Sequence, residues 1–128
     1  MKLVGLAILR IGAGLLFMQH GAQKLFGAFG GLGGAGQTAP LVSQMGLAGV
    51  LELGGGALIA AGLLTRPVAA ILVGEMIVAF FQAHFPRGGA PMQNGGELAL
   101  LYALIFVLLA SLGGGPFSVD AALFGRRD

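Results

Sequence analysis

Long apolar stretches separated by glycine- and proline-rich connections organise this chain. Four of them are candidate membrane helices, at roughly residues 3–26, 41–64, 67–84 and 97–112. A helix needs about 20 predominantly apolar residues to cross the hydrocarbon of a bilayer. The fourth stretch is the shortest, so a helix there either extends toward the N-terminus or lies with little tilt. The pattern predicts an all-α integral membrane four-helix bundle, with residues 1–128 forming a single domain.

The connections between these stretches have the residues expected of turns and loops. Residues 27–40 are uncharged and rich in glycine, and residues 85–96 contain two prolines and several glycines. Such segments favour irregular backbone over helix. Between the second and third stretches, Thr65-Arg66-Pro67 predicts a tight turn, with the proline well placed at the first position of a helix. The sequence Gly-Gly-Gly-Pro at 113–116 is expected to end the fourth helix.

Composition supports a membrane location and removes several classes of function. The 128 residues are 56% hydrophobic and only 9% charged, whereas a soluble domain carries about 25% charged residues. The lipid bilayer is therefore the expected surroundings of the chain. A net charge of +2 with scattered cations offers no basic patch for nucleic acid. The absence of cysteine excludes disulfides, iron–sulfur ligation and covalent attachment of c-type haem.

The distribution of basic residues predicts the orientation. With four spans, both chain ends and the turn at 65–67 lie on one side of the membrane, and this side has the larger share of cations. It carries Lys2, Arg66, Arg126 and Arg127, while the opposite side carries Lys24 and Arg87. Lysine and arginine are enriched in cytoplasmic segments. Both termini are therefore expected in the cytoplasm.

Three charged residues lie deep within the apolar stretches. Along helices that rise 1.5 Å per residue, Arg10 and Glu75 lie about 10 and 12 Å from the cytoplasmic end, and Glu52 about 18 Å. A charge at the bilayer centre costs about 2.5 to 3.5 kcal/mol on insertion scales. We therefore expect a buried charge network in which Arg10 bridges Glu52 and Glu75, or in which one carboxyl stays protonated. Such a network either fixes the register of the helices or serves a function.

A second, outer layer of polar residues is expected near the opposite end of the bundle. Its ligand-binding candidates are His20, Lys24, Asn94 and Glu97. Asn94 is expected to cap the fourth helix while Glu97 reaches back to the cap, as in a capping box. In the alternative interpretation, Glu97 faces a ligand.

The two histidines invite a haem or metal interpretation, which the pattern disfavours. A haem b needs two axial histidines at one depth on helix faces that point toward each other. His20 and His84 are expected at the same depth but not on such faces. A zinc or iron site built from His20, His84 and Glu97 has suitable ligand types but no local ligand spacing. We therefore expect no metal and no cofactor held within the chain.

Three segments together resemble the DoxX family over nearly the whole chain. The first is LRIGAGLLFMQHGAQKLFG at 9–27, the second is GLAGVLELGGGALIAAGLLTR at 46–66, and the third runs from HFPRG to NGGE at 84–97. The resemblance implies a four-helix integral membrane protein of the bacterial or archaeal plasma membrane, related to a subunit of a thiosulfate:quinone oxidoreductase. The patterned positions of the family correspond here to Arg10, His20, Gly21, Lys24, Glu52, Arg66, Asn94 and Glu97.

This resemblance leads to the leading hypothesis for function, a membrane component of a quinone-linked oxidoreductase complex that handles sulfur compounds or oxidative stress. In it, His20, Lys24 and Glu97 hydrogen-bond a quinone or transfer its protons. A bound flavin, a haem or a partner subunit has to carry the electrons, because the chain offers no redox side chain beyond Tyr102 and its methionines. Two alternatives remain open. One is a non-catalytic assembly or anchoring subunit, including a homo-oligomer, and the other is a small transporter.

Overall fold

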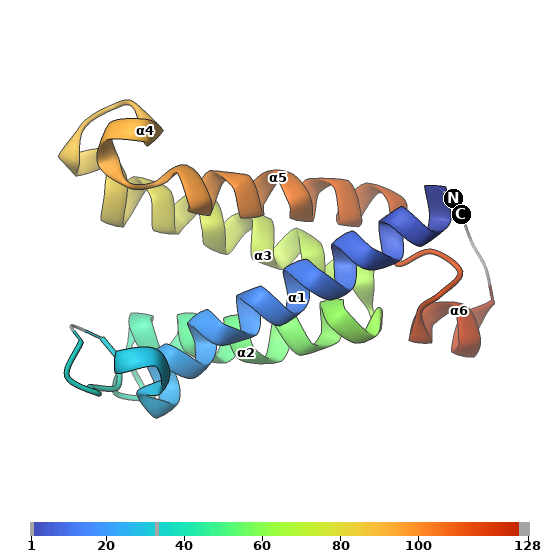
Figure 1. Ribbon diagram of the computed structural model, residues 1–128, viewed down its shortest axis with the longest axis horizontal. Helices are drawn as coiled ribbons and strands as arrows, with labels where there is room; N and C mark the ends of the chain where they lie inside the picture. Colours follow the sequence, from blue (N-terminus) through green and yellow to red (C-terminus); the bar gives the residue numbers. More distant parts are fainter. Residues whose placement is uncertain (1, 33, 126–128) are drawn as a thin grey trace.

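The computed structural model describes residues 2–32 and 34–125 and is built from helices (Figure 1). Four of them are long: α1 (Lys2–Phe26), α2 (Gln44–Ala61), α3 (Thr65–Ala79) and α5 (Glu97–Leu112). Helix α3 continues directly into a π-helical segment, η2 (Phe80–His84). These elements coincide closely with the four apolar stretches of the sequence, so the prediction of an all-α membrane bundle is confirmed.

Three helical segments are long and apolar enough to cross a membrane by length and composition. They are Leu3–Phe26, Gln44–Ala61 and Thr65–Arg87. Helix α5 is also apolar but has only 16 residues, fewer than any of these three segments. Its length is therefore about 24 Å. That α5 also spans the membrane stays a prediction.

Local sequence explains where the second helix begins and ends. The Ser43 hydroxyl accepts a hydrogen bond from the Gly46 N–H at 3.0 Å, which satisfies one of the free N–H groups of the first turn. At the other end Gly62 takes a left-handed conformation with φ of 75°, which glycine adopts without steric cost. Because this stop comes directly before α3, the connection between α2 and α3 is very short.

The long helices form two closely packed pairs, α1 with α2 and α3 with α5 (Figure 1). Glycines allow the first pair to approach closely. A Cβ atom at Gly14 would come within 2.6 Å of the Ala60 nitrogen, and one at Gly21 within 2.3 Å of the Leu53 nitrogen. Small residues at such crossings let membrane helices gain dispersion contacts along their backbones.

Aromatic and aliphatic side chains fill the space between the two pairs. The Phe17 ring from α1 lies 4.9 Å from the Tyr102 ring and 5.0 Å from the Phe106 ring, both on α5. The buried core also contains Ile59, Ala69, Leu72, Met76, Ala103 and Leu109. Many other large apolar side chains, among them Ile8 and Leu104, are exposed on the outside, as expected for a surface that faces lipid.

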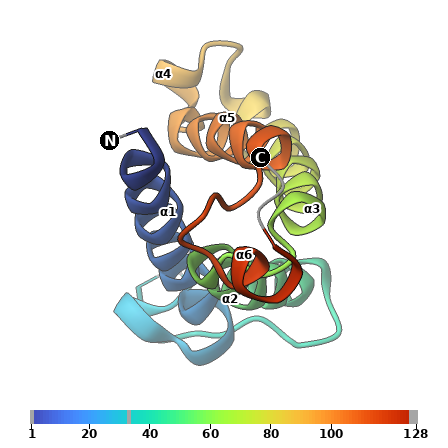
Figure 2. The ribbon, with the colours of Figure 1, turned by 90° about the vertical axis from the view of Figure 1, so that its right-hand side faces the viewer.

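Short elements close the two ends of the bundle. At one end lie η1 (Ala28–Gly30), η3 (Phe85–Arg87) and α4 (Pro91–Asn94). At the other end lies α6 (Val119–Phe124), which Figure 2 shows in front of α2. The positively charged end predicted from sequence is this one, with Arg66 at the start of α3. Arg126, Arg127 and the side chain of Lys2 lie outside the described part of the chain.

Candidate functional site

A buried ion pair joins the first two helices near the middle of the bundle. The Lys24 Nζ atom donates to Glu52 Oε1 at 2.7 Å, and the side chains are only 15% and 5% exposed. Helical side chains lean toward the N-terminus of their helix, so the long lysine chain reaches back from the end of α1 into the bundle. Lys24, expected at the outer edge, is thereby brought to the carboxylate that was expected in the inner layer.

Glu75 of α3 places a second carboxyl beside Glu52. The two residues face each other because each lies about 14 to 15 Å along its helix from the short turn that joins α2 and α3. Both carboxyl oxygens of Glu75 are buried, and neither has a hydrogen-bond partner among the described residues when the group is treated as an acceptor. Lys24, Glu52 and Glu75 are called the buried triad below.

Two further polar rings adjoin this triad. His20 packs edge-on against Tyr102, with the ring centroids 5.9 Å apart, and both groups lie within electrostatic reach of Glu52. The site therefore combines an ammonium group, two carboxyls, an imidazole and a phenol in one region of the bundle. Such a set can donate hydrogen bonds to a polar ligand and exchange protons with it.

An apolar groove of about 300 Å³ runs between α1 and α5 and reaches this polar region at Tyr102. Its other walls come from Ile8, Leu9, Gly12, Ala13, Leu16, Leu98, Leu101 and Ile105. The groove exists because these two helices pack far less closely with each other than within their own pairs. It offers an apolar surface along which a chain-like molecule could lie, and of the polar groups described above Tyr102 is the one that lines it.

Arg10 does not take part in this cluster, which corrects the expected bridge to Glu52 and Glu75. Its side chain is 1% exposed and donates to backbone carbonyls. The acceptors are Ile59 at 3.0 Å, Gly114 at 2.5 Å, Ala60 at 3.3 Å and Phe117 at 2.9 Å. Arg10 thus satisfies the free carbonyls at the end of α2 and fixes the segment that leads to α6. Its visible role is structural.

Arg10 lies away from its predicted depth because the helices do not all start in the same plane. In the structure Arg10 lies opposite Ile59 and Ala60, close to the C-terminal end of α2. Helix α1 therefore begins farther out than α2 ends. Glu52 lies about two turns deeper along α2 than Ile59, beyond the reach of the guanidinium.

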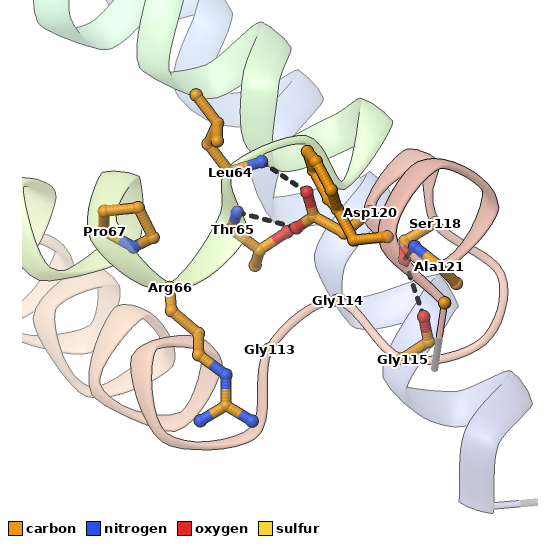
Figure 3. Close-up of a pocket in the computed structure, with 12 residues that line it drawn as sticks. Leu64, Thr65, Arg66, Pro67, Gly113, Gly114, Gly115, Ser118, Asp120 and Ala121 are labelled. Atoms are coloured by element: carbon orange, nitrogen blue, oxygen red, sulfur yellow. Dashed lines mark hydrogen bonds between the residues drawn. The ribbon is translucent and has the colours of Figure 1, made fainter. Parts of the chain in front are cut away.

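The same end of the bundle contains a second cavity, of about 530 Å³, between α6 and the start of α3 (Figure 3). In it the Asp120 carboxylate accepts hydrogen bonds from the backbone N–H groups of Leu64 at 2.7 Å and Thr65 at 2.9 Å. A residue distant in sequence thus supplies the N-terminal cap of α3. Burial opposes ionisation of the Asp120 carboxyl, but the hydrogen bonds from Thr65 and Leu64 outweigh it and lower the pKa of Asp120.

We expect Asp120→Ala to lower the free energy of unfolding at neutral pH by about 0.5 to 2 kcal/mol, the usual cost of removing an N-cap. Because the pKa is lowered in the folded state, the contribution of the carboxylate is fully present above the pKa of an unfolded aspartate, about 3.9. It is lost as the pH falls through the lower folded pKa. Thermal unfolding in detergent should therefore separate the two proteins at pH 7 and bring them together in acid. An equal difference at both pH values would contradict the cap.

The predicted outer layer is not a single site. Asn94 is buried and orders the loop before α5: its amide nitrogen donates to the Gly88 carbonyl at 2.8 Å, and its Oδ1 accepts from the Gly96 N–H at 2.8 Å. His84 Nδ1 lies 3.3 Å from the Asn94 carbonyl oxygen. Glu97 is exposed at the first turn of α5, whose N-cap is Gly96 without a side-chain cap. The expected capping box is therefore wrong, although Asn94 does bind backbone directly before the helix.

The structure also separates the residues of the disfavoured haem and metal sites. His20 lies against Tyr102 within the bundle, whereas His84 lies against Phe80 and the Asn94 loop. Within residues 2–32 and 34–125, no group of three or more metal-ligating side chains is brought together. Figure 1 shows the end of α1 and the start of α5 on opposite sides of the bundle.

A sequence model of the DoxX family matches residues 5–85, which include most of α1, all of α2 and α3, and the three residues of the buried triad. The chain belongs to the DoxX family. An uncharacterized protein of Haemophilus influenzae is 40% identical in an alignment 128 positions long. The alignment covers 94% of this chain and 92% of that protein. No solved structure matches the chain.

Membership of the DoxX family makes the chain an integral membrane protein, in contact with the bilayer. The position of Tyr102 beside His20 in this DoxX protein was not predicted, because a single tyrosine in an apolar helix is typical of a packed core. Its spacing is informative nonetheless: Tyr102, Phe106 and Leu109 recur at helical intervals and share the buried face of α5.

Proposed function

We propose that this DoxX protein is the quinone-binding membrane component of an oxidoreductase complex. The observation that carries the proposal is the apolar groove between α1 and α5, whose wall includes Tyr102, the residue that packs against His20 next to the buried triad. An isoprenoid quinone has the matching chemistry, with a long apolar tail and a head group of hydrogen-bond acceptors. Ligand sites commonly combine apolar walls with a few convergent polar groups of this kind.

Each group has a part in this proposal. The tail lies along the walls of the groove, and Tyr102 and His20 donate hydrogen bonds to the quinone carbonyls. Lys24 remains paired with Glu52, and its positive charge stabilises the negative charge that develops on the quinone during reduction. Glu97 has no part, because it is exposed at the start of α5.

The electrons come from a partner subunit in this proposal, which acts on sulfur compounds or in defence against oxidative stress. The chain supplies the membrane site and protons, and it needs no cofactor of its own. It lies in the bacterial inner membrane with both termini in the cytoplasm. This orientation places α6 and the cavity of Figure 3 on the cytoplasmic side, where a soluble partner would dock.

A glycine pair on α1 provides a matched test of the groove. Gly12 lines it, and a Cβ atom there meets no other atom within 4 Å; the same free space surrounds Gly5. Gly12→Leu is expected to fill the groove and reduce photolabelling of the purified protein by an azidoquinone at least tenfold, since the tail and the new side chain compete for one space. Gly5→Leu, on the same helix outside the groove, should label like the wild type.

Labelling that is unchanged in Gly12→Leu would contradict a quinone in this groove. Phospholipid and unlabelled quinone can be compared as competitors of the azidoquinone. If phospholipid suppresses the labelling as well as quinone does, the groove holds lipid chains instead. In that case, the assembly or anchoring role would account better for the structure, because the buried Arg10 already spends its four hydrogen bonds on backbone carbonyls.

A further inference from the structure

Lys24, Glu52 and Glu75 differ from an ordinary buried ion pair because the group contains one carboxyl more than it contains cations. Lys24 and Glu52 balance each other at 2.7 Å. The Glu75 carboxyl then has no countercharge of its own, and both of its oxygens are buried without a donor among the described residues. An uncompensated charge in this environment is very costly.

Two carboxylates cannot hydrogen-bond each other, because both only accept. Once Glu75 carries a proton, the same contact becomes an O–H···O⁻ hydrogen bond to Glu52. Glu52 then accepts from Lys24 on one side and from Glu75 on the other. The single proton removes both the unpaired charge and the unsatisfied polar atoms.

We propose that the buried triad is a proton-binding site that holds one proton on its carboxyl pair, chiefly on Glu75. The groups that face it are the ammonium of Lys24 and the imidazole of His20 from α1, the carboxyl of Glu52 from α2 and the phenol of Tyr102 from α5. Because Tyr102 also lines the groove, the site lies where a groove-bound molecule could exchange this proton.

For a quinone that is reduced in the groove, Glu75 would be a source of one of the protons that the hydroquinone takes up, with the electrons supplied by the partner subunit. That role rests on the proposed function. The existence of the proton-binding site does not, since it follows from the charges and contacts of the triad.

Charge balance fixes how many protons each variant should hold. Glu75→Gln leaves Lys24 and Glu52 as a neutral pair that needs none, and the new amide can still donate to Glu52. Lys24→Met removes the cation, so both carboxyls should be protonated. Glu97→Gln, which changes an exposed carboxyl outside the triad, should leave the count at one.

Infrared spectroscopy of the purified protein in detergent at neutral pH measures these counts directly, from the carbonyl stretch of protonated carboxyl groups and its shift in heavy water. The wild type and Glu97→Gln are expected to show one such group per chain, Glu75→Gln none and Lys24→Met two. The absence of the band from the wild type, or its full retention in Glu75→Gln, would overturn the proposal, as would a single band in Lys24→Met. If Glu75→Gln fails to fold, the wild-type count still decides, since zero or two groups would exclude the site.

Azidoquinone labelling of the same samples separates this inference from the proposed function. A wild type with one protonated carboxyl but no specific labelling would keep the proton site and reject the quinone. Specific labelling without a protonated carboxyl would do the reverse.

Discussion

Arg10→Met is expected to leave little folded protein, because it removes the donor of four hydrogen bonds to backbone carbonyls at once. A buried acceptor that loses its partner costs about 1 to 3 kcal/mol. With four such acceptors the loss approaches the whole free energy of unfolding of a typical domain, about 5 to 15 kcal/mol. The yield of monodisperse protein in detergent and its melting temperature measure the effect.

Arg10→Lys is the informative companion to this variant. Lysine keeps the positive charge but has three donors on a single nitrogen, whereas the guanidinium reaches carbonyls of both α2 and the segment before α6 with a planar fork. We expect an intermediate melting temperature. Wild-type stability in Arg10→Met would show that these hydrogen bonds do not hold the end of the bundle together.

The second large effect is expected where α1 and α2 come closest. A Cβ atom at Gly21 would lie 2.3 Å from the Leu53 nitrogen and 2.7 Å from the Gly49 carbonyl oxygen. Both are backbone atoms, so only a movement of the helices can relieve the clash. Gly21→Ala should therefore destabilise the protein by about 3 kcal/mol or more, at or above the upper end for overpacked cores.

Alanine at two other glycines is the control, measured by the same thermal unfolding in detergent. Gly5 on α1 and Gly54 on α2 have nothing within 4 Å of an added Cβ atom. Alanine favours helix over glycine by about 1 kcal/mol, so these variants should be as stable as the wild type or slightly more stable. If Gly21→Ala behaved like them, the close crossing of α1 and α2 would be wrong.

The sequence was sufficient to predict the helices, because a membrane helix is encoded locally. An uninterrupted apolar run predicts α1 and α5 without reference to any other part of the chain, and glycine or proline next to the run marks its ends. The expected boundaries 3–26 and 97–112 agree with Lys2–Phe26 and Glu97–Leu112 almost residue by residue. Membership of the family was also evident from short motifs.

The partners of the charged residues could not be predicted in the same way, because they depend on how far one helix is shifted along the next. The relative depth of Glu52 and Glu75 was predicted nearly correctly, since a short turn joins their helices. The depths of Arg10 and Lys24 relative to α2 were not, because a loop of irregular structure separates α1 from α2 and leaves their register free. The glycine crossings at Gly14 and Gly21, visible only in the structure, set that register.

The reach of a long side chain and the packing of the C-terminal segment were also beyond the local sequence pattern. The long side chain of Lys24 reaches Glu52. The C-terminal segment brings the Phe117 carbonyl to Arg10 and the Asp120 carboxylate to the start of α3. The tail of the sequence predicted only a short interfacial turn, without any contact to Arg10 or to the start of α3. These contacts depend on tertiary packing that the local pattern does not carry.

The most direct test of the account is affinity purification of this protein from native membranes in mild detergent, with identification of the copurifying proteins by mass spectrometry and of the extracted quinone by chromatography. A quinone-binding subunit should copurify with a stoichiometric oxidoreductase partner and with quinone, and Gly12→Leu should lose the quinone but keep the partner. Recovery of the protein alone, or only with further copies of itself, and without quinone, would contradict the proposed place of this chain in a quinone-linked complex.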